Sequence, residues 1–114
     1  MRNPASSFRK KMHGSIPQVI FRDSLRFGDL IEIKTRNSTY MLFVIDPKNF
    51  LVSGGWFERK GQAPTRVQIP GCTWGGTAIN LDVVAGKGMC IEFQDKAVTS
   101  RVLGMTLHRE TSLN

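Results

Sequence analysis

Short apolar runs, each of strand length, follow one another from Asp29 to His108 and are separated by glycine, proline and asparagine. Several runs alternate apolar and polar residues with a period of two, the period of a β-strand with one buried face. We find no stretch in this region where apolar residues recur at the helical period. The sequence therefore predicts an all-β fold, a small antiparallel β-barrel or sandwich of about seven short strands.

The strand pattern is clearest in the first two runs of this region. The run 30–35 places Ile31 and Ile33 on one face and two charged residues on the other. The run 39–45 is apolar on both faces, so we expect a central strand or one covered on both sides. The predicted strands span residues 30–35, 39–45, 50–53, 65–69, 79–83, 89–93 and 98–107.

The positive charge of the chain is concentrated near its N-terminus. The net charge of the 114 residues is +7, and residues 1–26 carry six basic side chains against one acidic side chain. These residues hold few large apolar groups, so burial offsets little of the entropy cost of ordering them. We predict a basic, poorly ordered extension over residues 1–26, one β-domain over 27–109 and a polar tail over 110–114.

Residues that carry chemistry are sparse. His13 and His108 are the two histidines, and neither stands within a recognisable catalytic or zinc-ligand spacing. We therefore expect no enzyme activity, no catalytic residue, no bound metal and no cofactor. The absence of a secretory signal or a long apolar run predicts a cytoplasmic protein with no membrane partner. Cys72 and Cys90 are then expected to be free thiols, with a disulfide between them as the alternative.

A basic extension on a nearly neutral body predicts binding to nucleic acid or another polyanion. Trp56 and Trp74 each adjoin a pair of glycines, and indoles exposed beside basic residues would form a platform for stacked bases. The alternative is that both indoles pack into the ends of a small barrel. The candidate polyanion-binding residues are Arg9, Lys10, Lys11, Arg22, Arg26, Arg59, Lys60 and Arg66.

Two further functions stay open at this point. Exposed edge strands would suit a self-associating interaction or assembly module, which would form a homo-oligomer. A barrel with a hollow beneath Trp56 or Trp74 would instead bind a small ligand. We also expect Trp56 and Phe57 to continue the predicted strand 50–53 after a glycine bulge, with a charged hairpin tip following them.

The body contains five recognisable stretches, at residues 33–40, 52–55, 74–77, 88–89 and 99–102. Through them the region from Gly28 to Leu107 resembles a group of small bacterial all-β proteins of uncharacterised function. The resemblance implies a soluble bacterial protein of all-β architecture. It implies no activity, ligand or site residue.

Overall fold

The computed structural model describes residues 11–76, 78–94 and 97–111. The described chain is mainly antiparallel β-strand, which confirms the predicted all-β class, with ten short strands where about seven were expected. A 3₁₀ turn, η2 (Arg22–Ser24), and one short helix, α1 (Gly55–Arg59), interrupt them. The strands are β1 (Lys11–Ser15), β2 (Val19–Phe21), β3 (Leu30–Thr35), β4 (Thr39–Val44), β5 (Asn49–Gly54), β6 (Thr65–Gln68), β7 (Gly71–Thr73), β8 (Val83–Gly86), β9 (Cys90–Glu92) and β10 (Val102–Thr111).

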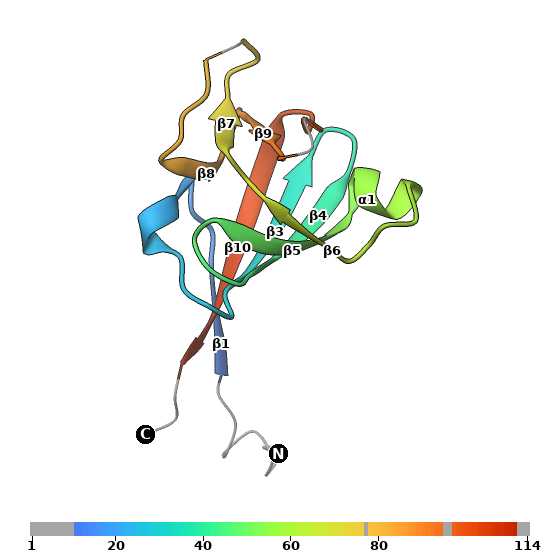
Figure 1. The fold of residues 1–114 in the computed structure, drawn as a ribbon. Helices are drawn as coiled ribbons and strands as arrows, with labels where there is room; N and C mark the ends of the chain where they lie inside the picture. Colours follow the sequence, from blue (N-terminus) through green and yellow to red (C-terminus); the bar gives the residue numbers. More distant parts are fainter. Residues whose placement is uncertain (1–10, 77, 95–96, 112–114) are drawn as a thin grey trace.

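Six strands form one antiparallel sheet in the order β1-β10-β3-β4-β5-β6. Two further two-stranded sheets, β2-β8 and β7-β9, pack over one face of it (Figure 1). The larger sheet ends at β1 on one side and at β6 on the other, so the sheets do not close into a barrel. The barrel alternative of the sequence analysis is therefore wrong, because these two edge strands do not pair with each other.

The alternation read from the sequence fixes which face of the large sheet is buried. In β3, Ile31 and Ile33 are fully buried while Glu32 and Lys34 are exposed. The neighbouring β4 pairs with both β3 and β5, which confirms the prediction of a central strand. Since a slip of one residue would turn these buried side chains to solvent, the pattern also fixes the register of the strands.

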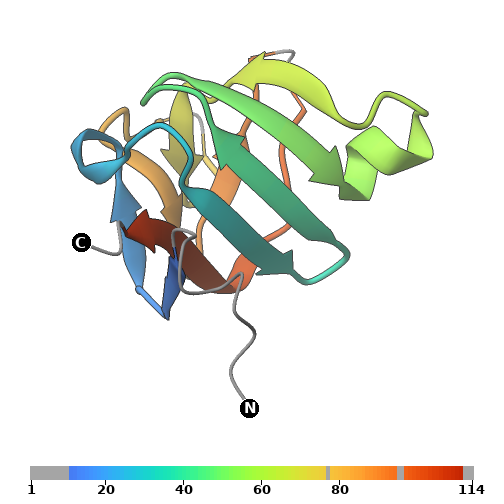
Figure 2. The same ribbon diagram turned by 90° about the horizontal axis from the view of Figure 1, so that it is seen from below.

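The chain turns into helix α1 where the sequence predicted that a strand would continue. Gly54 and Gly55 have φ angles of +89° and +48°, which a residue with a Cβ adopts only with strain. A Cβ on Gly54 would also collide with the backbone oxygen of Thr39. The turn carries Phe57 into the core, where its ring lies 5.0 Å from that of Phe93. The predicted bulge and hairpin tip are replaced by this helix, which lies beyond the end of β5 in Figure 2.

The part of the N-terminal extension that the structure describes is paired with the body. Strand β1 pairs with the end of β10, and β2 pairs with β8. Ile20 and Leu25 are buried in the core, which gives residues 11–26 two apolar anchors. The predicted boundary at residue 26 therefore does not separate them from the domain. Residues 1–10 lie outside the described residues, as do residues 112–114 of the predicted tail.

A buried ion pair ties the end of β10 to the turn before β3. The Asp29 side chain is 2% exposed and accepts two hydrogen bonds from Arg109, Nε to Oδ1 at 3.0 Å and Nη2 to Oδ2 at 2.8 Å. The backbone N–H of Arg26 also donates to Asp29 Oδ2. Hydrogen bonding to this carboxylate raises the pKa of Arg109. The buried negative charge of Asp29 is thus compensated by the guanidinium of Arg109 and by hydrogen bonds to both of its carboxylate oxygens.

Replacing Arg109 by methionine would leave the Asp29 carboxylate buried without its counter-charge. We expect the free energy of unfolding to fall by about 3 kcal/mol, measured by urea denaturation at pH 7. The matched control is Arg36→Met, because Arg36 is exposed in a turn and its side chain has no partner among the described residues. That control should stay within about 0.5 kcal/mol of the parent. Equal losses in the two variants would contradict the role assigned to the ion pair.

Candidate nucleic-acid interface

The structure gives the predicted polyanion-binding residues very different surroundings. Arg9 and Lys10 lie outside the described residues, and only the backbone of Lys11 is described, in β1. Arg22 is committed to the fold, and burial lowers its pKa. Its guanidinium donates four hydrogen bonds of 2.7 to 2.9 Å to backbone oxygens of Leu81, Pro47, Ile69 and Pro70. Arg22 thus holds three loops together and has little donor capacity left for a ligand.

Arg26 and Arg66 are exposed, but they lie at the end of the sheet where β4 leads into β5. Arg26 precedes β3, and Arg66 on β6 pairs with Leu51 of β5. Near it, the pKa of the Asp46 carboxyl is lowered, mainly by hydrogen bonds from the Lys48 backbone and the side chain of Asn49 and to a smaller degree by the charge of Arg66. This end of the sheet therefore carries an acid beside its cation.

At the opposite end of the sheet, the β3–β4 turn contacts other segments that carry basic residues. Arg59 of α1 donates from Nη1 to Ser38 Oγ at 3.1 Å. The backbone N–H of Arg36 donates to the oxygen of Arg101, also at 3.1 Å. In Figure 1 this turn and the start of β10 lie away from the two labelled termini, with α1 beside them. We define the basic cluster as Arg36, Arg59, Lys60, Lys87 and Arg101.

Arg101 connects the basic cluster to an exposed tryptophan. Its guanidinium donates from Nη1 to the oxygen of Gly88 at 2.6 Å and from Nη2 to the oxygen of Trp74 at 3.0 Å. The Trp74 side chain is 66% exposed. Its ring passes close to Gly88, where a Cβ would lie 3.3 Å from a ring carbon. The Trp74 indole therefore lies against Gly88, the residue that follows Lys87, while the Trp74 backbone is bonded to Arg101.

The two predicted stacking residues are not equivalent. Trp56 is half-buried, and its ring packs edge-to-face against Phe57 at 5.1 Å. The amino group of Lys60 lies 5.9 Å from the centre of the Trp56 ring, at the outer limit of a cation–π contact. Trp74 is thus the one of the two whose ring is mostly open to a ligand. Sequence alone could not separate them, because both adjoin glycine pairs.

The basic cluster forms no ion pair with an acid among the described residues. All five of its side chains are exposed. Within the described ranges the ion pair is that of Arg109 with Asp29, and none of the five cations has a carboxylate at ion-pair distance. Arg36 and Lys87 also lack any side-chain hydrogen bond to another described residue. Glu58 on α1 is the acid that stands closest in sequence to Arg59 and Lys60. The cluster can therefore offer several unpaired cations to a polyanion.

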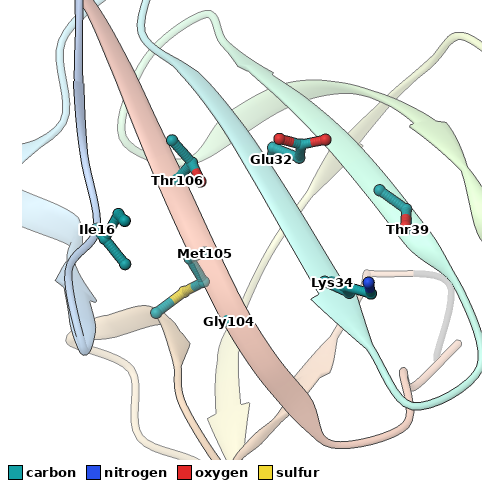
Figure 3. Close-up of a pocket in the computed structure, with 7 residues that line it drawn as sticks. All are labelled: Ile16, Glu32, Lys34, Thr39, Gly104, Met105 and Thr106. Atoms are coloured by element: carbon teal, nitrogen blue, oxygen red, sulfur yellow. The ribbon is translucent and has the colours of Figure 1, made fainter.

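Two surface hollows adjoin this region. One, of about 540 Å³, is lined by Trp74 and the chain that follows β7. The other, of about 340 Å³, lies on the open face of the six-stranded sheet (Figure 3). There Gly104 supplies no side chain, while Glu32 and Lys34 point from the same face with opposite charges. Because its charges offset each other, the second hollow is the weaker candidate for an anionic ligand.

The cysteines are free and one of them is part of the core. Cys72 is buried and its Sγ donates to the backbone oxygen of Val84 at 3.1 Å. Burial raises the pKa of the Cys72 thiol to about 12, so it is not poised as a nucleophile. Cys90 is half-buried and unpaired. In the part of the chain that the structure describes, no three histidine, cysteine or acidic side chains gather as metal ligands would.

Comparison of the chain with protein-family models, curated proteins and solved structures found no match in any of the three. The resemblance to small bacterial all-β proteins therefore stays a prediction. Neither helix of the described ranges has the length and apolar character needed to cross a bilayer. The candidate site accordingly rests on the geometry of this molecule alone.

The two thiols should differ sharply in reactivity. At pH 8, four units below its pKa, only about one Cys72 in ten thousand is a thiolate, and its sulfur is buried. We expect iodoacetamide to alkylate Cys90 of the folded protein while Cys72 stays unmodified, measured by peptide mass spectrometry. Both should react after unfolding in guanidinium chloride. Equal modification of the two in the folded state would contradict the buried position of Cys72.

Proposed function

We propose that this protein is a non-enzymatic binding module for single-stranded nucleic acid, and that the basic cluster at the β3–β4 turn is its contact surface. The observation that supports the proposal is a set of five exposed cations, none with a carboxylate at ion-pair distance among the described residues, one of which, Arg101, is bonded to the backbone of a residue with an exposed indole. Proteins that bind single strands without sequence preference combine a basic surface for the backbone with aromatic rings for the bases. Within the all-β class, we assign the two packed layers of strands to a sandwich.

The cations of the cluster differ in how they would meet phosphate. The side chains of Arg36 and Lys87 have no hydrogen-bond partner among the described residues, so both can turn toward a phosphate without breaking a described contact of the fold. Arg59 and Arg101 are partly committed, Arg59 to Ser38 and Arg101 to two backbone oxygens. Those contacts hold their guanidinium groups in place, so less side-chain entropy remains to be lost on binding. The cluster therefore combines fixed and adaptable charges.

The positive charge at the N-terminus remains part of the proposed binding surface, but with fewer residues than the sequence predicted. Residues 1–10 contribute three basic side chains and no acid, which adds attraction to any polyanion. Arg22 no longer belongs to this set, because its guanidinium is held by four backbone oxygens. A deletion that tests the leader should therefore stop at residue 10 and leave β1 intact.

Binding should depend strongly on salt. Five contacts to the phosphates of a single strand predict a slope of about −3.5 in a plot of log affinity against log salt concentration. We expect a fluorescein-labelled 12-nucleotide strand to bind with roughly micromolar affinity at low salt, followed by fluorescence anisotropy. The double variant Arg36→Glu with Lys87→Glu should bind at least about tenfold more weakly and should flatten the slope by about 1.4 or more.

The matched control reverses the same amount of charge elsewhere. Lys48 and Arg66 are exposed and lie toward the β4–β5 end of the sheet. Their double reversal to glutamate should weaken binding by less than about threefold, since a distant exposed charge is largely screened. Equal losses in the two double variants would show that net charge, and not this cluster, governs binding. No binding of the parent protein at low salt would end the proposal.

Self-association is the second candidate, and one observation favours it. The open face of the large sheet carries a row of apolar side chains, Leu30, Phe43 and Leu51, at paired positions on β3, β4 and β5. Phe27, 74% exposed, stacks edge-to-face on Phe43 at 5.7 Å between ring centres. Size-exclusion chromatography with light scattering separates the two candidates. A protein concentration of roughly 100 to 200 µM would populate even a weak dimer. A strict monomer at that concentration would exclude self-association.

A further inference from the structure

We propose that the hollow beside Trp74 is a subsite for one unstacked base, preferring bases with an exocyclic amino group. This inference rests on the proposed function, since it supposes that a strand is already held by the basic cluster. It adds a position at which the protein contacts a base as well as phosphates. The hollow measures about 540 Å³ and lies along the chain between β7 and β8.

The walls of the hollow suit a flat, partly apolar ligand. Trp74 and Leu81 line it and are 66% and 61% exposed, so each offers apolar surface that a ligand would cover. Met89, nearly fully buried, contributes to the lining from beneath. Every base has a π-face that can stack on an indole, so this part of the site accepts any base.

Trp74 is held in place before any ligand arrives. Its backbone oxygen accepts a hydrogen bond from Arg101 Nη2 at 3.0 Å. The hydroxyl of Thr73, buried at the end of β7, accepts from the N–H of Gly75 at 3.1 Å and donates to the oxygen of Gly76 at 3.0 Å. Since the loop is fixed on both sides of the indole, stacking on it requires little further ordering of the protein.

The polar edge of the hollow indicates which part of a nucleotide would enter. Asp82 lines the hollow and is exposed; its carboxylate interacts electrostatically with Arg22 but has no hydrogen-bond partner among the described residues. The side-chain oxygen of the neighbouring Asn80 is occupied by the backbone N–H of Asp82, at 3.0 Å. A carboxylate repels phosphate but accepts a hydrogen bond from an amino group such as N4 of cytosine. The base would therefore face Asp82 while its phosphate stays at Arg101.

Arg101 links the two subsites. It belongs to the basic cluster through its contact with Arg36, and it donates to the backbone of the residue whose indole lines the hollow. A strand whose phosphate contacts Arg101 or Lys87 would thus have a base within reach of Trp74. With Asp82 meeting the base and Arg101 meeting its phosphate, the two charges would orient the bound nucleotide.

Three 12-nucleotide strands separate base recognition from phosphate binding: oligodeoxycytidine, oligodeoxyuridine, and an abasic strand of tetrahydrofuran spacers. We expect oligodeoxycytidine to bind about threefold tighter than oligodeoxyuridine and at least about tenfold tighter than the abasic strand. In the variant Trp56→Phe, Trp74 is the sole tryptophan, and its fluorescence should be quenched by the first two strands and not by the third. To the Trp74→Ala variant, oligodeoxycytidine should bind no more tightly than the abasic strand, while the dependence of affinity on salt concentration should stay unchanged. Asp82→Asn should lose the preference for cytosine.

Each alternative result has a distinct meaning. Equal affinity for all three strands, with Trp74 fluorescence unchanged, would overturn the base subsite and leave the phosphate-binding cluster standing. Equal affinity for cytosine and uracil strands would overturn the part assigned to Asp82. Absence of binding to every strand at low salt would remove the proposed function and the subsite together. Trp74 fluorescence that changes with protein concentration alone would instead assign the hollow to a second copy of the chain.

Discussion

The burial of one face of the six-stranded sheet beneath the two small sheets is the constraint on which the rest of the molecule depends. Inward-facing side chains of β3 and β4, such as Ile33 and Leu42, are fully buried there. Their alternation permits one register of the two strands, because any slip by one residue would expose them. That register places the β3–β4 turn beside α1 and the start of β10. The basic cluster is therefore a consequence of core packing, although none of its side chains lies in the core.

Charged residues divide into those whose side chains hold the fold and those whose side chains bond to no other described residue. Arg22, Arg36 and Arg109 are all arginines, yet Arg22 donates to four backbone oxygens and Arg109 binds a buried carboxylate. Arginine serves such positions well, because its planar fork can satisfy several acceptors at once. Among the described residues, the side chains of Arg36 and Lys87 have no such acceptor, which leaves their charge exposed. The function of a basic side chain here is set by the acceptors around it, which sequence position does not reveal.

Much of the strand architecture could be predicted from apolar periodicity, and the remainder depended on distant contacts. The runs 30–35 and 39–45 were predicted correctly, because local alternation decides them. Residues 79–83 also alternate, yet the strand there begins only at Val83. Before it, Asn80 pairs with Cys72 through an isolated β-bridge and not through a continuous ladder. Strand β1 was missed because its partner, the end of β10, is nearly a hundred residues away. Of the candidate site, Arg59, Lys60 and Trp74 were identified from sequence. Arg36, Lys87 and Arg101 were not, because their segments meet only through distant contacts, such as those of Arg101 with Arg36 and Gly88.

The most direct test of the proposed nucleic-acid interface is a two-dimensional ¹⁵N–¹H NMR titration of the protein with a short single-stranded oligonucleotide. The account predicts that backbone signals of the β3–β4 turn, of Lys87 and of Arg101, together with the indole N–H of Trp74, shift in a concentration-dependent way. The signals of Arg66 and of Leu51 on the open face should stay in place. Shifts confined to that open face, or no shift in the turn at saturating oligonucleotide, would contradict it.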